Sequence, residues 1–558
     1  MNPQQMIQSA ARHQQAGRLA EAEALYGQFI QTCGEHAEVL NQLAIVLHRQ
    51  GKVDGAIDAY RRTVAVRPDL PKAQNNLAVL LNERGRHDEA IAACRQAIAV
   101  RPDYPEAHNN LGNALQALGR FEEAVAAYRT ALELRPDYTK AASNFGGALQ
   151  GAGKLDEAGA VLRDLLKTTP DFAEAHNNLG GVLIEQGKFD EAIASIRRAL
   201  SLRTDYLDAW NNLGNALMKQ GRPDEAIAAL RGALALNPDQ PLLRFGLGSL
   251  LLLKGDFSEG WREYEQRWRV PELGLQRFAF VQPRWAGEPL DGRRILLWSE
   301  QGFGDTIQFA RYAPEIVKRG GRIVLGVQPD LERLMRSMEG VERLVTQAQP
   351  EEFDAHLPLL SLPLVLGTTV ETIPAAVPYL HADAALVQRW RERISQHAEA
   401  LKVGVVWAGR PTHKNDRNRS MPLEKLKALQ AIDGIWLLNL QKGETARRAL
   451  EAPDAPTLTD WTSELNDFAE TAALIECLDL VITVDTSVVH LTGALGKPVW
   501  VLLPFMPDWR WLLGRDDSPW YPSARLFRQP FAGDWDSVIE AVVRALQEHP
   551  FLDPHGSR

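Results

Sequence analysis

At 558 residues the chain is longer than one hydrophobic core usually organises, so two or more domains are expected. Its formal charge is -9 at pH 7, with acidic and basic residues mixed along the chain, which argues against a broad nucleic-acid-binding face. Cys33, Cys94 and Cys477 are far apart and odd in number, which fits a reducing compartment and provides no zinc-ligand spacing.

The first residues, MNPQQMIQSAARHQQ, lack the basic start and apolar stretch of a secretory signal, and no apolar run is long enough to cross a membrane. The most apolar segment, residues 247–253, fits a buried repeat helix, and contact with a membrane surface is the alternative. We therefore expect a cytoplasmic protein with no transmembrane segment.

Glycine recurs every 34 residues through the first half of the chain, a period typical of helix-turn-helix repeats. These glycines are Gly17, Gly51, Gly85, Gly119, Gly153, Gly187, Gly221 and Gly255. Alanines with the same period let the paired helices approach closely: Ala56, Ala90, Ala124, Ala158, Ala192 and Ala226. Prolines are expected to stop the second helices, at Pro68, Pro102, Pro136, Pro170 and Pro238, with Thr204 where one proline is missing.

This pattern resembles the tetratricopeptide-repeat family over residues 1–268. The resemblance implies an all-α solenoid, because each unit buries its apolar stripe only by stacking on its neighbours. The concave surface of such a solenoid is available for a protein or peptide, which is the partner expected for this part of the chain.

Asparagine occupies one position of the first helix in five repeats, directly before a Leu or Phe. This asparagine row consists of Asn76, Asn110, Asn144, Asn178 and Asn212. Amides both donate and accept, so the row can hydrogen-bond the backbone of an extended peptide without reading its sequence. The alternative is that these side chains serve helix packing. The row resembles the asparagine ladder of the O-linked N-acetylglucosamine transferase family, which implies binding of an acceptor protein.

The 34-residue period ends after Trp268, and residues 269–293 are expected to form a linker. Short apolar runs then alternate with helix-length segments, which indicates parallel sheets. The runs are residues 295–299, 322–327, 403–408, 435–440, 480–484 and 499–503. Segment 385–400 divides them, so the sequence predicts two Rossmann-like lobes, 294–384 and 401–545, with a cleft between them and a tail at 546–558.

The first candidate motif, residues 299–312, places Asp305 after a glycine turn, at the start of a helix expected from about Thr306. A helix-capping aspartate is one interpretation of this residue. A dinucleotide-binding turn at Gly302 and Gly304 is a weaker one, because the third glycine of that fingerprint is absent.

The second motif, residues 484–498, follows a buried strand with Asp485, Thr486 and Ser487 and continues into a helix of small residues. Backbone N–H groups and the helix dipole at such a helix start bind phosphate. His490, one turn into the helix, either adds a donor to this site or is a buried histidine with satisfied hydrogen bonds.

Two further loops follow strand ends. The loop of residues 408–420 gathers Arg410, Lys414, Arg417 and Arg419. Four cations suit a diphosphate, and a solvated surface loop is the alternative. In residues 440–448, the side chains placed to reach a base or ribose are Gln441, Lys442 and Glu444.

Together these motifs resemble the GT-B glycosyltransferases, and most closely the ADP-heptose heptosyltransferase family, over about residues 292–530. The resemblance implies that Asp305 is the general base, that Arg419 binds donor phosphate and that the helix start at Thr486 holds the diphosphate. It also implies inversion of stereochemistry, with a nucleotide-sugar as co-substrate and neither metal nor cofactor. Ser487 stands where that family usually has glycine, which leaves the identity of the donor open.

The sequence therefore predicts a bacterial, cytoplasmic glycosyltransferase whose acceptor is a protein held by the repeats. A transferase for glycan or lipopolysaccharide precursors, with repeats used for docking, is one alternative, and a non-catalytic repeat scaffold is another. Asp534 and Asp536 form an Asp-x-Asp that is expected to cap the last helix rather than bind metal. Residues 508–522 resemble bacterial repeat-linked transferases, but no chemical role follows for Arg510 or Trp511.

Overall fold

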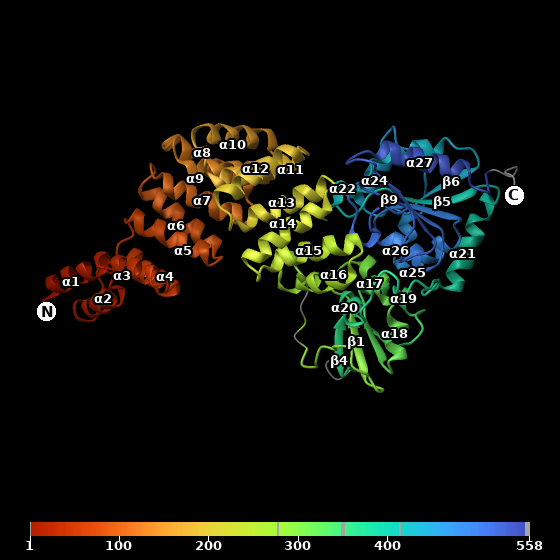
Figure 1. Ribbon diagram of the computed structural model, residues 1–558, viewed down its shortest axis with the longest axis horizontal. Coiled ribbons are helices and arrows are strands. Elements are labelled where there is room, and N and C mark those ends of the chain that lie inside the picture. The colour runs from red at the N-terminus through yellow and green to blue at the C-terminus, as the bar shows by residue number, and fades with distance from the viewer. Residues whose placement is uncertain (1, 276–277, 279, 348–351, 412–414, 553–558) are drawn as a thin grey trace. The chain divides into compact units, whose positions relative to one another are not determined.

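The computed structural model describes residues 2–275, 278, 280–347, 352–411 and 415–552 (Figure 1). The chain consists of two compact units, Met1–Ala216 and Leu217–Arg558. Within the described residues, the first unit is helical, and the second combines helices with two parallel β-sheets. The predicted order of helical repeats followed by an α/β part is confirmed.

The repeats are helical hairpins that continue from Pro3 to Tyr264. The eight periodic glycines lie in the turns within these hairpins with φ between +72° and +87°. Glycine adopts this left-handed conformation without the strain that a side chain brings. The helices are α1 Pro3–Gln15, α2 Leu19–Cys33, α3 Ala37–Arg49, α4 Val53–Val66, α5 Pro71–Glu83, α6 His87–Val100, α7 Pro105–Ala117, α8 Phe121–Leu134, α9 Thr139–Gly151, α10 Leu155–Thr168, α11 Ala173–Glu185, α12 Phe189–Leu202, α13 Leu207–Lys219, α14 Pro223–Leu236, α15 Pro241–Lys254 and α16 Phe257–Tyr264.

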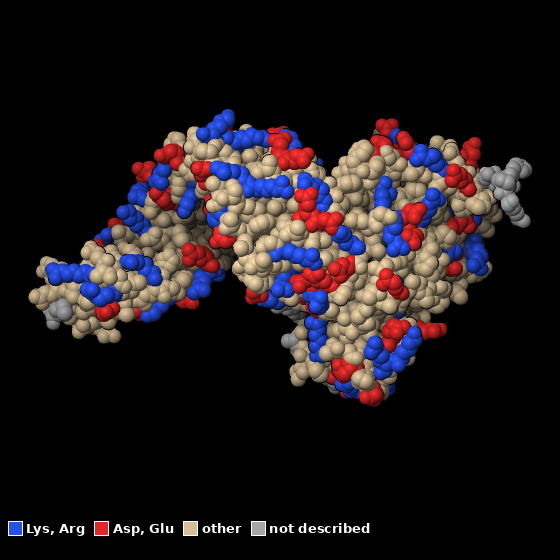
Figure 2. All heavy atoms as spheres, viewed as in Figure 1, with Lys and Arg blue, Asp and Glu red and all other residues tan. Residues whose placement is uncertain are grey.

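Small residues and ion pairs hold the hairpins together. The six periodic alanines are at most 1% exposed, which lets the two helices of a hairpin pack closely. Ion pairs also join the two helices of one hairpin, as where Arg135 at the end of α8 pairs with Glu106 of α7 at 2.6 Å and Arg203 at the end of α12 with Glu174 of α11 at 2.7 Å. On the face drawn in Figure 2, basic and acidic side chains are accordingly interspersed.

The last hairpin, α15 and α16, packs against the α/β part of the second unit. Trp261 Nε1 donates to the Thr368 carbonyl at 3.2 Å, and its ring meets Trp509 edge to face at 5.1 Å. Residues 247–253 lie in α15, and the leucines among them are at most 4% exposed, as predicted for a buried repeat helix. The boundary between compact units therefore falls within α13, although the repeat period continues to α16.

The first lobe of the α/β part contains a four-stranded parallel sheet in the order β3-β2-β1-β4. On one face of this sheet, Leu296, Trp298 and Val324 form a small core with Val345 and Phe353, and Trp268 and Phe280 pack against it. The strands are β1 Arg294–Trp298, β2 Arg322–Gly326, β3 Val341–Val345 and β4 Ala355–Pro358. The helices are α17 Phe303–Ala310, α18 Ala313–Lys318, α19 Glu332–Met335 and α20 Leu362–Val365.

The second lobe contains a six-stranded parallel sheet in the order β10-β9-β8-β5-β6-β7. Its strands are β5 Leu401–Val406, β6 Ile435–Asn439, β7 Thr459–Asp460, β8 Leu480–Val484, β9 Val499–Leu503 and β10 Ala524–Arg528. Its helices are α22 Asp416–Arg419, α23 Lys427–Gln430, α24 Glu444–Leu450, α25 Phe468–Glu476, α26 Ser487–Ala494 and α27 Trp535–Gln547, and α21 Ala384–Ile394 precedes it. Asp534 caps α27 by accepting from Ser537 N at 3.1 Å, as predicted. No helix among the described residues is long and apolar enough to cross a membrane.

Candidate active site

Asp305 lies at the start of α17, directly after the carboxyl end of β1. The helix begins at Phe303, three residues earlier than expected, and Gly302 is its N-cap. Asp305 is therefore not the capping residue. Its Oδ2 reaches back and accepts from Gly302 N at 3.0 Å, which orients the carboxylate within its own turn.

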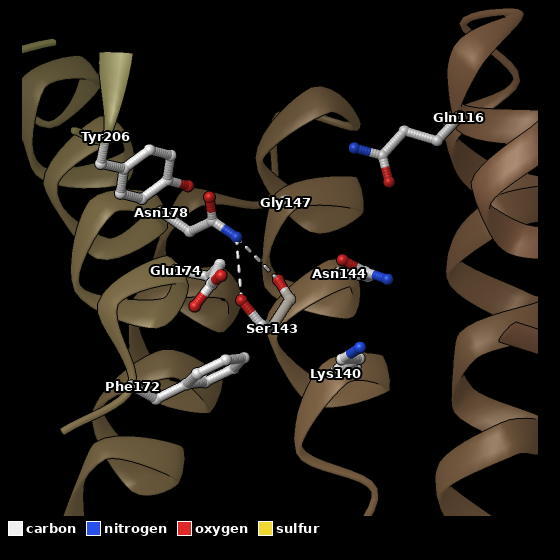
Figure 3. Close-up of a pocket in the computed structure, with 9 residues that line it drawn as sticks. All are labelled: Gln116, Lys140, Ser143, Asn144, Gly147, Phe172, Glu174, Asn178 and Tyr206. Atoms are coloured by element: carbon white, nitrogen blue, oxygen red, sulfur yellow. Dashed lines mark hydrogen bonds between the residues drawn. The ribbon is translucent and has the colours of Figure 1, made fainter. Parts of the chain in front are cut away.

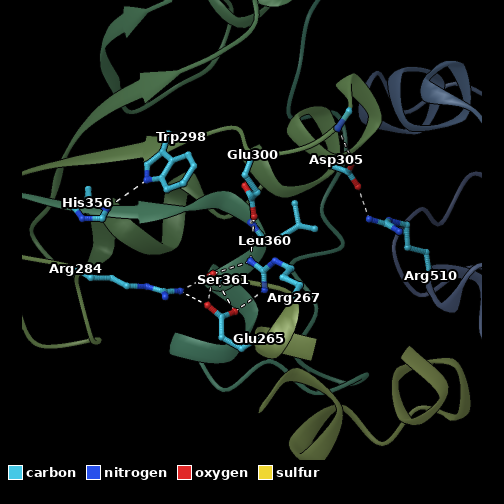
Figure 4. A network of polar contacts seen from close by, with 11 residues as sticks. Glu265, Arg267, Arg284, Trp298, Glu300, Asp305, His356, Leu360, Ser361 and Arg510 are labelled. Atoms are coloured by element: carbon cyan, nitrogen blue, oxygen red, sulfur yellow. Dashed lines mark hydrogen bonds and ion pairs between the residues drawn. The ribbon is translucent and has the colours of Figure 1, made fainter. Parts of the chain in front are cut away.

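Arg510 of the second lobe holds the other oxygen of this carboxylate (Figure 4). It lies in a short 3-10 helix, η9 Trp509–Trp511, and its Nη2 donates to Asp305 Oδ1. Asp305 and Arg510 are 205 positions apart in the sequence, and no local pattern links them. The sequence analysis therefore gave Arg510 no role.

Opposing effects set the pKa of Asp305. Burial raises it above its usual value, the positive charge of Arg510 lowers it, and the negative charge of Asp508 raises it again. The net direction is upward. A raised carboxylate pKa suits a group that has to take a proton near neutral pH.

The start of α26 lies beside the start of α17. Thr486 is the N-cap of α26, and its hydroxyl accepts from Val488 N at 3.3 Å. A β-carbon on Gly304 would come within 3.4 Å of Ser487 Cα and 2.7 Å of the His490 ring, so the absence of a side chain at Gly304 allows the two helices to touch. This contact brings the Asp305 motif and the 485–490 motif together.

Asp485, at the carboxyl end of β8, is the acid of this second motif. Burial and the nearby Asp508 raise its pKa to about 6, against the lowering effect of Arg510 and Arg419. Arg419 Nη1 donates to the Asp485 carbonyl at 3.1 Å, which fixes the guanidinium next to the start of α26. Arg419 also contacts Asp416 Oδ1 at 3.3 Å.

Arg419 is the member of the predicted cation cluster that the structure places at this motif. Arg410 and Arg417 belong to the same loop and are exposed. Lys414 lies outside the described residues. The four cations of the loop are therefore not equivalent, and Arg419 alone among the three described ones contacts Asp485.

His490 is a buried histidine with a protein partner. Its Nδ1 lies 3.0 Å from the Tyr521 hydroxyl, and its ring stacks on Trp511 with centroids 5.8 Å apart. Burial lowers its pKa well below the usual value, and the positive charges of Arg510 and Arg311 add to this. His490 is thus held neutral, which favours the structural interpretation over a contact with the donor.

The three residues after β6 have different surroundings. Gln441 Oε1 accepts from Ala408 N at 3.0 Å, so it ties the loop after β6 to the loop after β5. Lys442 Nζ donates to the Leu465 carbonyl. Glu444 begins α24, is exposed, and pairs with Arg447 and Arg448 at 2.8 Å each. Gln441 is the one of the three that lies between two strand ends.

The asparagine row connects successive repeats. Asn110, Asn144 and Asn212 donate to the asparagine one position before the previous row member, at 2.8, 3.2 and 2.9 Å. Asn178 donates to Ser143 Oγ at 3.0 Å, and Asn76 donates to the Tyr60 hydroxyl at 3.2 Å. These bonds support the packing interpretation for the amide nitrogens.

Two members of the row also line a pocket of about 390 Å³ (Figure 3). Its lining residues are Gln116, Lys140, Ser143, Asn144, Gly147, Phe172, Glu174, Asn178 and Tyr206. The pocket offers three amides, a cation, an anion and two aromatic rings. Packing and ligand binding are therefore compatible uses of the same side chains.

A second polar network, which the sequence analysis missed, surrounds Glu300 (Figure 4). The Glu300 side chain is fully buried, and its Oε1 accepts from Arg267 Nη2 at 3.1 Å and from Leu360 N at 3.2 Å. Burial raises its pKa to about 7 although Arg267 lowers it. Arg267 also contacts Glu265 at 2.6 Å and Ser361 at 2.9 Å, so the chain after α16 is anchored at the ends of β1 and β4.

Comparison with known proteins divides the chain in the same way. Tetratricopeptide-repeat family models match residues 9–71, 69–137, 115–180, 183–244 and 217–260. The model of glycosyltransferase family 9 (heptosyltransferase) matches residues 433–503, which include β6, β8, β9 and the 485–490 motif. The chain thus contains tetratricopeptide repeats, and a part of its α/β region is similar to glycosyltransferase family 9.

Among individual proteins, the chain is similar to Protein FlbA of Caulobacter vibrioides, with 28% identity over 330 residues, 55% of each chain. It therefore spans about half the length of that curated relative. A solved tetratricopeptide-repeat protein from Parabacteroides merdae aligns with 44% of this chain and 97% of its own at 17% identity and a TM-score of 0.40. YrrB, a TPR protein with an unusual peptide-binding site, aligns with 33% of this chain and 96% of its own at 20% identity and a TM-score of 0.29.

Proposed function

We propose that this protein is a metal-independent, inverting glycosyltransferase that moves a sugar from a nucleotide-sugar to a protein held by the repeats. The observation that carries the proposal is the meeting of two helix starts, α17 with Asp305 and α26 with Thr486 and Ser487, between two parallel-sheet lobes. Ligands of open α/β sheets bind at the carboxyl ends of the strands, which is where both helices begin.

The donor diphosphate is assigned to the start of α26. The backbone N–H groups there and the positive end of the helix dipole favour an anion. Arg419, held against the Asp485 carbonyl, adds a guanidinium for the phosphate oxygens. Charge that develops on the departing nucleoside diphosphate is stabilised by these groups, so the proposed step needs no metal.

Asp305 is assigned as the general base. The acceptor hydroxyl oxygen forms a bond to the anomeric carbon, its proton passes to the Asp305 carboxylate, and the bond from that carbon to the diphosphate oxygen breaks. A carboxylate has about four lone-pair positions. Gly302 N and Arg510 Nη2 occupy one on each oxygen, so positions remain for the acceptor hydroxyl.

The acceptor is assigned to the repeats. The pocket beside Asn144 and Asn178 offers groups that hydrogen-bond a peptide backbone and pack against side chains. A protein acceptor fits this arrangement.

The deciding experiment incubates the purified chain with UDP-, ADP-, GDP- and TDP-linked sugars and follows nucleoside diphosphate release and label in protein. We expect one donor class to be used and the Asp305→Asn variant to be inactive. A thermal-shift panel with the free nucleotides UDP, ADP, GDP, TDP and CMP identifies the donor class independently, since a ligand at about 100 times its Kd stabilises by roughly 2.7 kcal/mol. Label in a glycan fraction but not in protein would replace the acceptor assignment, and no response to any nucleotide would contradict the transferase.

A further inference from the structure

Arg510 contacts three residues through three different nitrogens. Its Nη2 donates to Asp305, its Nε donates to Gln308 Oε1 at 2.7 Å, and its Nη1 donates to Asp508 Oδ1 at 2.7 Å. Asp305 and Gln308 belong to α17 of the first lobe, whereas Arg510 and Asp508 belong to the second. Arg510 is only 7% exposed, so this connection between the lobes is shielded from solvent.

We propose that Arg510 is a positioning residue for sugar transfer, which aligns the Asp305 carboxylate with the acceptor hydroxyl and makes that alignment depend on the contact between the two lobes. This inference rests on the proposed function, because it assigns Arg510 a part in the same reaction.

The geometry supports this role because the carboxylate is held from two directions. Gly302 N binds Oδ2 from within the turn, and Arg510 binds Oδ1 from the other lobe. Without Arg510, the carboxylate keeps one anchor and can rotate. The planar guanidinium has five donors in a fixed fork, which lets one side chain hold Asp305, Gln308 and Asp508 at once.

The surroundings of Arg510 fix it in turn. Its guanidinium lies 4.2 Å from the centroid of the Trp509 ring. Trp509 packs edge to face against Trp261 at 5.1 Å and Tyr264 at 5.7 Å, both from α16. The last repeat hairpin therefore supports the segment that presents Arg510.

The backbone directly after η9 is strained. Leu512 has φ 51° and ψ -172°, a conformation that L side chains rarely adopt, and its side chain is buried. Such strain persists only where the surrounding structure enforces it, and it clusters at functional segments. The strained residue thus marks the segment that places Arg510 against α17.

The charges around Asp305 make the role measurable. Arg510 and the more distant Arg267 lower the pKa of Asp305, while burial and Asp508 raise it, and Glu300 is a further acid within electrostatic reach. His490, which lies against Gly304, is held neutral. Removing the Arg510 charge leaves burial and Asp508 opposed by the hydrogen bond from Gly302 N and by Arg267, so the pKa of Asp305 rises. The acid limb of the kcat/KM profile is then expected to move to higher pH.

The test compares the full chain with Arg510→Gln, Arg510→Lys and Arg393→Lys, using the donor that the wild type accepts. Arg393 is the matched control, because it also pairs with a carboxylate, Glu464, at 2.6 Å and lies over a tryptophan ring, that of Trp461, at 4.2 Å. For Arg510→Gln we expect kcat to fall by about 10²-fold, within the range that general-base catalysis contributes, with the acid limb at higher pH and KM for the donor little changed. Arg510→Lys keeps the charge, so we expect its acid limb to stay at the wild-type pH while its kcat falls. For Arg393→Lys we expect the wild-type kcat and the wild-type acid limb.

If Arg510→Gln has the kcat and the acid limb of the wild type, the positioning role is overturned. A loss of kcat in Arg393→Lys equal to that in Arg510→Gln would overturn it too. If Arg510→Gln does not fold, a folded Arg510→Lys with wild-type kcat would also overturn it. If the wild type uses none of the UDP-, ADP-, GDP- or TDP-sugars, the proposed function and this role are both overturned. Failure of the Arg510 role alone is recognised by an active wild type.

Discussion

Gly304 and His490 are so close that a β-carbon on Gly304 would come within 2.7 Å of the His490 ring. Gly304 belongs to α17 in the first lobe and His490 to α26 in the second. The ring has little freedom to move, because it bonds Tyr521 and stacks on Trp511. The fit between the lobes therefore depends on glycine at this position.

We predict that Gly304→Ala destabilises the protein by about 1–3 kcal/mol, the usual cost of overpacking, and reduces transfer by separating α17 from α26. Urea unfolding and nucleotide release measure the two effects. Gly302→Ala is the control for stability, since a β-carbon there would lie at an ordinary 3.4 Å from Asp305 Oδ2. Equal stability of wild type and Gly304→Ala would show that the lobes have room to separate.

Asp305→Asn is expected to abolish transfer and to leave donor binding largely intact, because the proposed base acts on the acceptor and not on the diphosphate. The amide keeps an oxygen for Arg510 but takes no proton at neutral pH. Nucleoside diphosphate release reports transfer, and the thermal shift with the matching nucleotide reports binding. Equal loss of both would assign Asp305 to the donor site instead.

The fold was predictable because its signals are local. The 34-residue glycine period reflects a turn within each hairpin, and the apolar runs reflect single buried strands. Asp305 and the 485–490 motif were recognisable as candidates for the same reason, since each lies where a strand is followed by a helix start. The assignment of each side chain's partner was not predictable from such patterns.

Arg510 and Glu300 show why. Arg510 is bound to Asp305, 205 positions away, and Glu300 to Arg267, 33 positions away. Their roles therefore follow from how the lobes and the last hairpin pack. His490 stood in a recognisable motif, but whether it faces a ligand or Tyr521 depends on residues 31 positions later. The spacing of a motif therefore predicts where such a site lies, but it does not show which of its side chains are hydrogen-bonded to other parts of the protein.

The two interpretations of the asparagine row can be separated with Asn178 and Lys140, which line the same pocket. Asn178→Ala removes a hydrogen bond to Ser143 and is expected to cost about 0.5–1.5 kcal/mol of stability. If the pocket also binds the acceptor, Lys140→Ala raises the KM for protein acceptor with stability unchanged. Destabilisation by Asn178→Ala with wild-type acceptor kinetics in both variants would leave packing as the sole role of the row.

Glu300 gives the protein a specific pH dependence of stability. Its pKa in the folded state is about 7, above the usual 4.5, so between these values the folded state binds more protons than the unfolded state. Its contribution to stability is fully present below pH 4.5 and is lost as pH rises to about 7, with a size on the order of 3 kcal/mol at most. In urea unfolding from pH 5 to 8, the free energy of unfolding should therefore decline less with pH in Glu300→Gln than in wild type.

Glu265→Gln is the control for this prediction, because Glu265 belongs to the same network with the opposite shift. Arg267 and Arg284 lower its pKa despite burial, so its contribution is present above its unfolded pKa and is lost as pH falls. Glu265→Gln should therefore be less stable than the wild type at neutral pH. Its free energy of unfolding should also fall less than that of the wild type on acidification. Identical pH profiles for the two variants would mean that Arg267 does not distinguish the two carboxylates, and that Glu300 is ionised at neutral pH like an ordinary glutamate.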